Sequence, residues 1–377
     1  MAIRRLTRQL HRIVHWSAHD ARAGREPTRA LDGERDLYEV STWEPRTAFD
    51  RFALGAERIA GGYWKVLFLG ILFLLAAFSV VAALLVLWLV PGLGRYTLLS
   101  VLLAFAITAY LWYAFASPQL PLQPLVVTFA LALPLTILAG TWNTTFRGVE
   151  TLPLLGVVLY AFLVVAPAEE VAKLLAVRLY AYADDRQFSR VVDGAVYGAV
   201  AGLAFATVEN FSYIFQEAMV VLSRQPYAPL RFVLGDVAAT RLFSAPGHVL
   251  YSAFAGYYLG LARFNREHAG AIVVKGLLVV ILVHATFNVV VAEALPDLLG
   301  LGDVGWSLLV LTYDGAFGYV LYRKLSRYRD AYEAAAERGG SPPGVPPSAA
   351  PPGAPTDRTL DAVAGSGSVP EDDAPPH

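Results

Sequence analysis

Residues 153–182 read PLLGVVLYAFLVVAPAEEVAKLLAVRLYAY, an apolar run long enough to cross a bilayer that nevertheless contains Glu169, Glu170 and Lys173. A transmembrane helix needs about 20 predominantly apolar residues. An ionisable side chain at the bilayer centre costs roughly 2.5–3.5 kcal/mol on insertion scales, so it needs a partner or a function. Glu169 and Lys173 lie one helical turn apart, and Pro167 predicts a kink just before them. The run therefore predicts a helical membrane protein with a polar site inside the bilayer.

The composition of the whole chain agrees with this prediction. Of the 377 residues, 56% are hydrophobic and 16% are charged, whereas a soluble domain has about 45–50% apolar and about 25% charged residues. The chain has no cysteine, which excludes disulfides, thiolate metal sites and cysteine nucleophiles. The formal net charge is −1, and we expect no nucleic-acid partner.

Eight apolar runs are long enough to span the membrane as helices. They cover residues 64–90, 96–117, 122–140, 153–182, 192–217, 241–264, 271–293 and 304–323. We therefore expect an all-α fold, a polytopic helical membrane protein with about eight transmembrane helices. With both termini cytoplasmic, most Lys and Arg residues of the connections fall on the cytoplasmic side, as the positive-inside rule requires. The sequence thus predicts a multi-pass protein of the cell membrane.

Three regions follow from this organisation. Residues 1–63 form a cytoplasmic N-terminal region, in which apolar and basic residues recur at helical spacing over residues 3–14 and predict a helix lying on the membrane surface. Residues 64–323 form the transmembrane domain. Residues 324–377 form a cytoplasmic juxtamembrane segment and a Pro/Gly/Ala-rich tail, whose composition predicts disorder.

Polar residues on four of the spans are predicted to meet at one depth. Counted at about 1.5 Å per residue from the outer ends of their spans, Glu169, Glu209, His248 and His284 all lie in the outer half of the bilayer. We therefore predict one polar catalytic cluster there. Its candidate catalytic residues are Glu169, Glu170, Glu209, His248, His284 and Asn288. Its supporting residues are Lys173, Asn210 and Arg241.

Each of these residues also has a structural interpretation. The two adjacent glutamates and Lys173 could be a neutralised ion pair that locks two helices together. Single histidines in membranes often form interhelical hydrogen bonds, Asn210 and Asn288 could be packing amides, and Arg241 could be an interfacial anchor. The shared depth favours one common site over these separate roles.

Three further features are interpreted structurally. Glycines recur at every fourth position of the run 192–217 and predict close helix packing. Asn143 begins an Asn-Thr-Thr glycosylation sequon, which we place on an outer loop. Asp314 is an isolated acid in the last span, and the sequence shows no evident partner for it.

The predicted cluster has the groups that amide hydrolysis needs. Two carboxylates held together at low dielectric do not both ionise easily, so the pair can provide an acid and a base. Glu169 or Glu170 would activate a water molecule, and His248 would assist proton transfer. His284 and Asn288 would stabilise the oxyanion.

Four motifs occur in order on four predicted spans. They are EExxK at Glu169, Glu170 and Lys173, FxxxEN at Phe205, Glu209 and Asn210, an isolated His248, and HxxxN at His284 and Asn288. Together they resemble the PrsW family of intramembrane proteases, within the wider superfamily of CAAX-type endopeptidases. The resemblance covers about residues 150–295, the expected protease core. It implies hydrolysis of a membrane-anchored protein or peptide near the outer membrane surface. Glu209 stands where the CAAX prenyl endopeptidases have a histidine, which argues against a prenylated substrate.

The sequence leaves a metal-dependent and a metal-free route open. It has no HExxH motif, but Glu169, His248 and His284 could bind a divalent metal such as Zn²⁺ and leave one position open. The family is usually called a metalloprotease, whereas we favour the metal-free route.

Two alternative functions use the same residues. One is a proton- or cation-coupled carrier, which the lack of internal repeats disfavours, and the other is a non-catalytic protein that binds a membrane partner.

Overall fold

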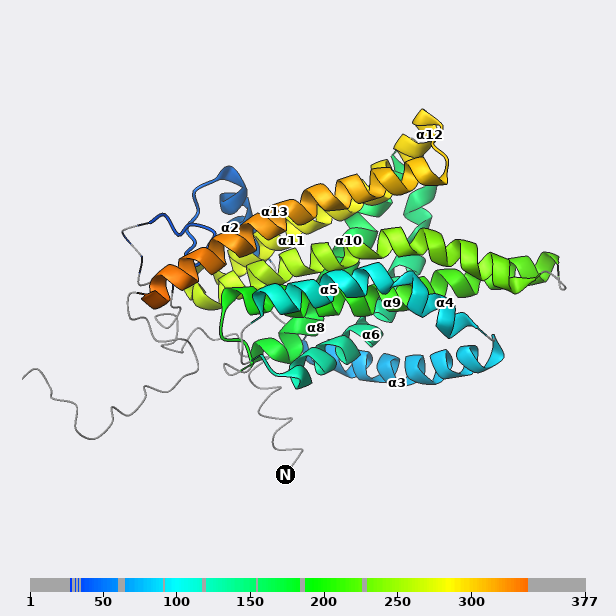
Figure 1. Ribbon diagram of the computed structural model, residues 1–377, viewed down its shortest axis with the longest axis horizontal. Coiled ribbons are helices and arrows are strands. Elements are labelled where there is room, and N and C mark those ends of the chain that lie inside the picture. The colour runs from blue at the N-terminus through cyan, green and yellow to red at the C-terminus, as the bar shows by residue number, and fades with distance from the viewer. Residues whose placement is uncertain are drawn as a thin grey trace, which may run out of the picture. The chain divides into compact units, whose positions relative to one another are not determined.

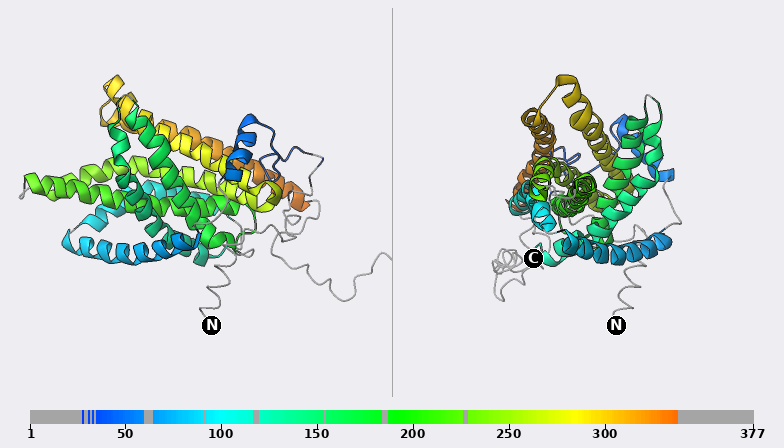
Figure 2. Two further views of the ribbon diagram at one scale, coloured as in Figure 1. Left: turned by 180° about the vertical axis from the view of Figure 1, so that it is seen from behind. Right: turned by 90° about the vertical axis from the view of Figure 1, so that its right-hand side faces the viewer.

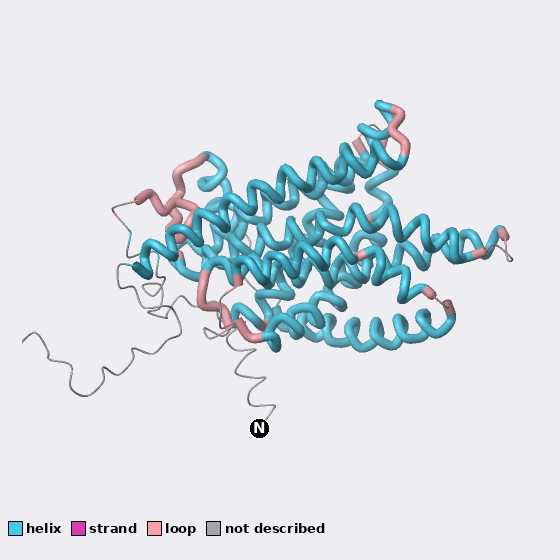
Figure 3. The backbone as a smooth tube through the Cα atoms, viewed as in Figure 1, coloured by secondary structure: helices cyan, strands magenta, loops and turns pink. Residues whose placement is uncertain are grey.

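The computed structural model describes residues 28, 31, 33, 35–59, 65–90, 92–116, 120–153, 155–183, 187–225 and 229–337. These residues form helices joined by short loops, and no strand is drawn among them (Figure 1, Figure 3). The all-α fold class is therefore confirmed. The surface helix predicted for residues 3–14 and most of the predicted disordered tail lie outside the described residues.

Helices and short helical turns follow one another along the described chain. In order, they are α2 (Ala48–Ile59), α3 (Lys65–Leu89), α4 (Leu93–Ser100), α5 (Leu102–Phe115), α6 (Leu122–Thr145), η3 (Arg147–Thr151), α7 (Gly156–Tyr160), η4 (Ala161–Val165), α8 (Ala166–Leu179), η5 (Ala181–Ala183), α9 (Val191–Arg224), α10 (Leu230–Phe264), η6 (Arg266–His268), α11 (Ala269–Thr286), η7 (Phe287–Ala294), α12 (Leu295–Leu299) and α13 (Asp303–Glu337). Of the short turns, η4 and η7 are π-helical, and the others are 3₁₀-helical.

The structure does not confirm the predicted number of eight transmembrane helices. Among the described residues, the helices long and apolar enough to cross a membrane are Leu122–Thr145, Val191–Arg224, Arg266–Leu299 and Asp303–Glu337. A fifth is reached if the part of α3 from Ala77 and the helix α4, which meet at 112°, are counted as one span. The run predicted at 96–117 is broken between α4 and α5 at Val101. Helix α10 contains many small and polar residues and is covered by neighbouring helices, and a helix that faces protein needs less apolar surface than one that faces lipid.

Helices α9 and α10 run side by side and touch through their backbones (Figure 1). A Cβ atom at Gly194, Gly198 or Gly202 of α9 would overlap a backbone carbonyl oxygen of α10. At Gly202 that oxygen belongs to His248. The predicted close packing is therefore confirmed, and only glycine permits it, because any side chain would push the helices apart. The contact fixes Glu209, on the same helix as these glycines, relative to His248.

The backbone forms π-helical turns directly before α8 and directly after α11, two helices that carry candidate site residues. The turn Ala161–Val165 ends directly before α8, in which Pro167 lacks an N–H group, and Phe287–Ala294 directly follows α11. Such turns bond residue i to residue i+5 and are frequent at functional sites. The predicted irregularity at Pro167 thus lies in the turn before it. Asn288 lies in the second wide turn, so it does not follow His284 by a regular α-helical turn.

The segment before α2 packs against the ends of α10, α11 and α13, and α2 lies beside α11 (Figure 2). Asn265 accepts a hydrogen bond from the backbone N–H of Trp43 (2.9 Å) and donates one to the carbonyl of Ser41 (2.8 Å). The hydroxyl of Tyr257 donates to the carbonyl of Glu39 (2.6 Å). Part of the N-terminal region is therefore held on the helical domain by specific hydrogen bonds.

Candidate active site

Six of the predicted residues form a continuous chain of contacts across α8, α9, α10 and α11, which we call the polar network. Its contacts are Arg241 to Glu209 (3.1 Å), Glu209 to His248 (2.7 Å), His248 to Lys173 (3.1 Å), Lys173 to Glu170 (2.7 Å) and Glu170 to His284 (2.8 Å). The structure thus joins residues from four helices that are far apart in the sequence. A chain of alternating charges and histidines of this kind fixes the position and the hydrogen-bonding direction of each member.

Glu170 lies in the middle of the polar network and is fully buried. One of its carboxylate oxygens accepts hydrogen bonds from Lys173 Nζ (2.7 Å) and from His284 Nδ1 (2.8 Å). When Nδ1 donates to a carboxylate, the other nitrogen of a neutral imidazole carries a lone pair. Glu170 therefore orients His284 so that Nε2 is an acceptor, the arrangement that also tunes histidines in hydrolytic and metal sites.

The neighbouring Glu169 faces a different environment. Its Oε1 accepts a hydrogen bond from the side-chain amide of Asn143 on α6 (2.9 Å), and its buried Oε2 has no hydrogen-bond partner among the described residues. Oε2 lies 3.7 Å from Nε2 of His284. The backbone carbonyl of Asn143 in turn accepts a hydrogen bond from the hydroxyl of Tyr160 (2.8 Å). A fifth helix therefore contributes to the site.

The position of Asn143 corrects one expectation from the sequence. Asn143 lies in the last turn of α6 and is not on an outer loop. Its amide is engaged by Glu169 and is half-buried. In the sequence, this residue is interpreted as part of a glycosylation sequon, and Asn143 was not among the candidate site residues.

Arg241 holds the other end of the polar network in place. Its guanidinium contacts Glu209, and its Nε donates to the side-chain oxygen of Asn210 (2.8 Å). The amide of Asn210 donates to the hydroxyl of Ser100 on α4 (2.9 Å). The guanidinium also lies over the ring of Tyr213, 4.3 Å from its centroid. Arg241 and Asn210 thus link α9, α10 and α4 behind Glu209.

A cleft of about 910 Å³ opens beside Glu169. Its walls come mainly from α6, α9, α10 and η7. The predicted site residues that line it are Glu169, Glu209, Arg241, His248, His284 and Asn288. Glu170 and Lys173 are not among its described lining residues. The two adjacent glutamates therefore differ in location, since one faces the cleft and the other lies behind it.

The formal charges of the polar network balance without Glu169. Two cations, Lys173 and Arg241, contact two carboxylates, Glu170 and Glu209. Glu169 is an additional carboxylate that is only 7% exposed. A buried carboxylate that no cation of the polar network neutralises is unfavourable, so Glu169, which also lines the cleft, is suited to take a proton or to bind a cation or a water molecule.

Asp314, for which the sequence showed no partner, is connected to His284 through Tyr251. The hydroxyl of Tyr251 donates to its carboxylate (2.6 Å), and both side chains are buried. The ring of Tyr251 lies 5.7 Å from the imidazole of His284, measured between centroids. This pair supports one face of His284.

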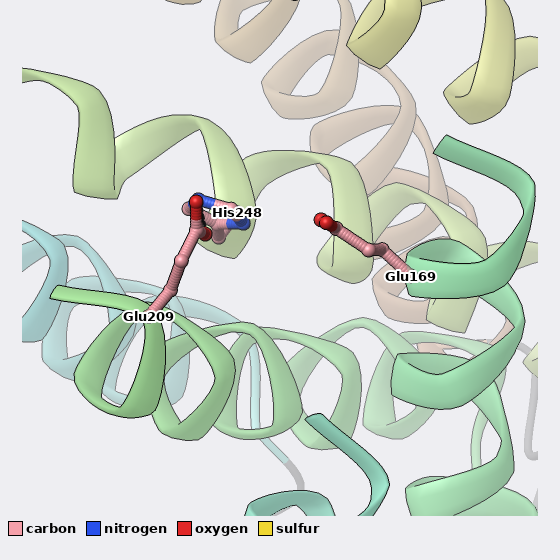
Figure 4. Close-up of side chains that lie close together, drawn as sticks. All are labelled: Glu169, Glu209 and His248. Atoms are coloured by element: carbon pink, nitrogen blue, oxygen red, sulfur yellow. Dashed lines mark ion pairs between the residues drawn. The ribbon is translucent and has the colours of Figure 1, made fainter. Parts of the chain in front are cut away.

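Glu169, Glu209 and His248 form a candidate metal group. Figure 4 shows Glu169 pointing toward the pair formed by Glu209 and His248, and one ligand atom of each residue lies within 4.8 Å of the others. The set predicted from the sequence had His284 in place of Glu209. Two carboxylate oxygens and one imidazole nitrogen suit a divalent ion such as Zn²⁺ in donor type.

The contact between His248 and Lys173 determines whether Nε2 of His248 can bind such a metal. An ammonium group has no acceptor, so Lys173 donates to Nδ1 of His248 in their 3.1 Å contact. A neutral imidazole then carries its proton on Nε2, the nitrogen that contacts Glu209 at 2.7 Å. Coordination through Nε2 would require Lys173 to move away or to give up its proton. The donor atoms therefore fit a metal, whereas the contact between Lys173 and Nδ1 fits a proton on Nε2.

Comparisons with known proteins give concordant results. The family described as PrsW family intramembrane metalloprotease matches residues 120–315. "Protease PrsW" of Clostridioides difficile is 29% identical over 131 residues, 34% of this chain and 50% of the relative. "Protease PrsW" of Shouchella clausii is 30% identical over 133 residues, 35% and 54% of the two chains. "Protease PrsW" of Geobacillus kaustophilus is 32% identical over 104 residues, which are 28% of this chain and 39% of the relative.

The matched part of the chain spans about half the length of the first two of these curated relatives. The family match over residues 120–315 includes the cleft-lining residues and the whole polar network. No solved structure gives a significant match.

Proposed function

Because the chain belongs to the PrsW family of intramembrane metalloproteases, we propose that it is an intramembrane endopeptidase that hydrolyses peptide bonds of a membrane-anchored protein or peptide. The observation that carries this proposal is the position of Glu169, a buried carboxylate that lines the cleft together with His284 and has one oxygen held by Asn143. We place the protein in the cell membrane with both termini cytoplasmic, on the distribution of its basic residues.

Glu169 acts as the general base in this proposal. A water molecule in the cleft that bridges Glu169 Oε2 and His284 Nε2, which lie 3.7 Å apart, can donate one hydrogen to each of these acceptors. Its oxygen lone pairs then face the cleft and can attack a substrate carbonyl carbon. Holding nucleophile and base in this geometry converts a reaction between separate molecules into one within a single complex. Asn143 and Glu170 fix the two acceptors.

The remaining steps use other residues of the cleft. As water attacks, its proton passes to Glu169, and the carbonyl oxygen gains negative charge. The side-chain amide of Asn288 provides a donor for this oxyanion, while His284 Nε2 keeps accepting the second hydrogen of the attacking water. Glu169 then delivers its proton to the leaving amine, so that the C–N bond breaks and the base is restored. Glu209 and Arg241 hold His248 at the opposite side of the cleft.

A metal, if bound, would be held by Glu169, Glu209 and His248 and would supply a Lewis acid and an acidified water. Since the contact with Lys173 places the imidazole proton of His248 on Nε2, we expect the purified protein to contain far less than one Zn²⁺ per chain by elemental analysis. We also expect a chelator to change its cleavage rate by less than about twofold. A stoichiometric ion that is absent from Glu209→Ala would overturn the metal-free route.

The proposed function is tested by comparing newly formed protein termini in membranes from cells that make the wild type or Glu169→Gln at matched levels. We expect termini close to transmembrane segments in the wild-type sample, and their loss in the variant. These termini would also identify the substrate. Identical termini in both samples, with both proteins folded, would contradict the proposal. In that case, ion flux in liposomes would test the carrier function and partner capture would test the binding function.

A further inference from the structure

Gly140 stands in the interior of α6, where glycine is the least favourable residue apart from proline. Elsewhere in this fold, helix glycines such as Gly194 and Gly198 are explained by contact with a neighbouring backbone. Gly140 has no such explanation, because a Cβ atom there would have no described atom within 4 Å. The space that this glycine leaves open is therefore not used by packing.

The open space belongs to the cleft. Gly140 is one of the cleft-lining residues of α6. It lies one helical turn before Asn143, which also lines the cleft and donates to Glu169. Residues three apart on a helix are neighbours on one face. A group that occupied the space at Gly140 would thus lie one turn of α6 away from the residue that holds the proposed general base.

The part of α6 around Gly140 that lines the cleft consists largely of threonines, with Ile137 and the polar Asn143. The hydroxyls of Thr136, Thr141 and Thr144 donate to backbone carbonyls of α6 itself, at 2.8, 2.8 and 2.9 Å. Threonines bonded in this way use their hydroxyl proton within the helix. Their methyl groups and the side chain of Ile137, which also lines the cleft, remain to contact a substrate.

We propose that the space at Gly140 is a subsite for a large apolar side chain next to the bond that is cleaved, and that the size of residue 140 determines which substrates fit. The substrate is a segment of a membrane protein in extended form, since the carbonyl groups of an intact helix are bonded within the helix. This inference rests on the proposed function and specifies its substrate class. Gly140 acts on specificity and takes no part in the chemistry.

The test is a size series at residue 140, with Gly140→Ala, Gly140→Leu and Gly140→Phe compared with the wild type in membranes. The residues that flank each Glu169-dependent terminus are read by terminal proteomics. We expect termini flanked by Leu, Ile, Phe or Met to fall at least tenfold in Gly140→Phe. Termini flanked by Gly or Ala should persist, and Gly140→Ala should lie between Gly140→Phe and the wild type.

Gly315 provides the matched control. It also lies inside a long helix, α13, is exposed, and would have no described atom within 4 Å of a Cβ. It does not line the cleft among the described residues. The same three substitutions at Gly315 should leave the cleavage pattern unchanged. Thermal unfolding of both series in detergent shows that the proteins are folded, and the Ala variants favour the helix in each case.

Each outcome decides the inference. Loss of large-residue sites in the Gly140 series alone supports it. An unchanged pattern in Gly140→Phe, or an equal loss of all sites in the folded Gly140→Ala variant, would overturn the inference while the proposed function stands. Termini that do not depend on Glu169 even in the wild type would overturn the proposed function and this inference with it.

Discussion

Glu169→Gln is expected to abolish cleavage in a protein that stays folded, whereas Glu170→Gln is expected to lose both cleavage and stability. The two glutamates are adjacent in the sequence and identical in chemistry. They differ in what they contact. Glu169 lines the cleft and accepts a hydrogen bond from Asn143, whereas Glu170 is fully buried behind it and accepts hydrogen bonds from Lys173 and His284.

Glutamine at residue 169 keeps the shape of the side chain and can still accept the hydrogen bond from Asn143. It cannot take a proton from water, so kcat/KM should fall by about 10²–10⁴-fold, the usual contribution of a general base. Because no buried ion loses its counterion, the free energy of unfolding should stay within about 1 kcal/mol of the wild type.

Glutamine at residue 170 removes the negative charge that neutralises Lys173. Lys173 is 1% exposed, and breaking a buried ion pair by removing one partner costs roughly 3–5 kcal/mol. His284 also loses the carboxylate that sets its orientation. Glu170→Gln should therefore lower both the unfolding midpoint and the activity.

Thermal unfolding in detergent and cleavage in proteoliposomes of a substrate identified from its termini measure the two effects. Glu217→Gln on α9 is the control, because Glu217 is exposed and does not line the cleft among the described residues. Equal losses of stability in Glu169→Gln and Glu170→Gln would contradict the assignment of different roles to the two residues.

The parts of the site that sequence reasoning located are those that contrast with apolar surroundings. Glu169, Glu209, His248 and His284 stand out because an ionisable group inside an apolar run needs a physical reason. Their order in the chain and their depth along each helix are also readable. The direction of each side chain is not readable from spacing alone. The sequence therefore could not tell which of two adjacent glutamates would face the cleft.

Asn143 was missed because its signal had another reading. A neutral amide near the end of an apolar run costs little, and the two threonines that follow it matched a glycosylation sequon. Its contact with Glu169 joins α6 to α8 across 26 positions. Such a contact depends on helix packing, in which α6 lies against α8 and α9. A single sequence contains no direct record of that packing.

The irregular turns η4 and η7 were also beyond prediction in detail. Pro167 signalled a distortion, but a π-helical turn before it depends on neighbouring helices that tolerate a wider backbone. The turn that contains Asn288 carries no proline before Pro296 and gave no signal. The assumed α-helical spacing of His284 and Asn288 was therefore the natural expectation, and the structure departs from it.

Glu39→Lys is expected to release the segment before α2 from the helical domain. Glu39 contacts Lys275 on α11 and, at 2.8 Å, Lys324 on α13. Lys275 also contacts Asp50 of α2 (2.7 Å). We call Glu39, Asp50, Lys275 and Lys324 the Glu39 cluster. A third lysine in place of Glu39 would put three cations together, and we expect a loss of about 2–3 kcal/mol, less than for a fully buried pair because the side chains are partly solvated.

The backbone of Glu39 indicates how strongly the cluster holds. Its φ is 56°, in the left-handed region that non-glycine residues seldom occupy, and no other described non-glycine residue has a positive φ. Such a conformation costs of order 1–3 kcal/mol and persists where surrounding contacts determine it. Glycine would remove that strain. In Glu39→Gly, the segment before α2 should nevertheless dock less tightly than in the wild type, because Lys275 and Lys324 both lose the carboxylate that they contact.

Docking of the segment before α2 is expected to weaken at low pH. Burial raises the pKa of Glu39, but the charges and hydrogen bonds of Lys324 and Lys275 outweigh it and leave the pKa below its usual value. Burial likewise opposes ionisation of Asp50, and hydrogen bonds from Lys275 and Thr47 lower its pKa to about 2. Carboxylates with depressed pKa values stabilise the docked state above their unfolded pKa of about 4. That stabilisation is lost as the pH falls from about 4 toward 2.

Hydrogen exchange of residues 35–54 in detergent-solubilised protein measures the docking. Glu44→Lys is the control on the same segment, because Glu44 is 60% exposed and pairs only with the exposed Arg46 among the contacts of the described residues. We expect faster exchange in Glu39→Lys, and wild-type exchange in Glu44→Lys. Equal exchange in the two variants would contradict the role of the Glu39 cluster in docking.

Lys275 and His284 share α11, and the Glu39 cluster lies about 14 Å along this helix from the cleft. A loss of cleavage in Glu39→Lys would therefore show that docking of the N-terminal segment also sets the position of His284.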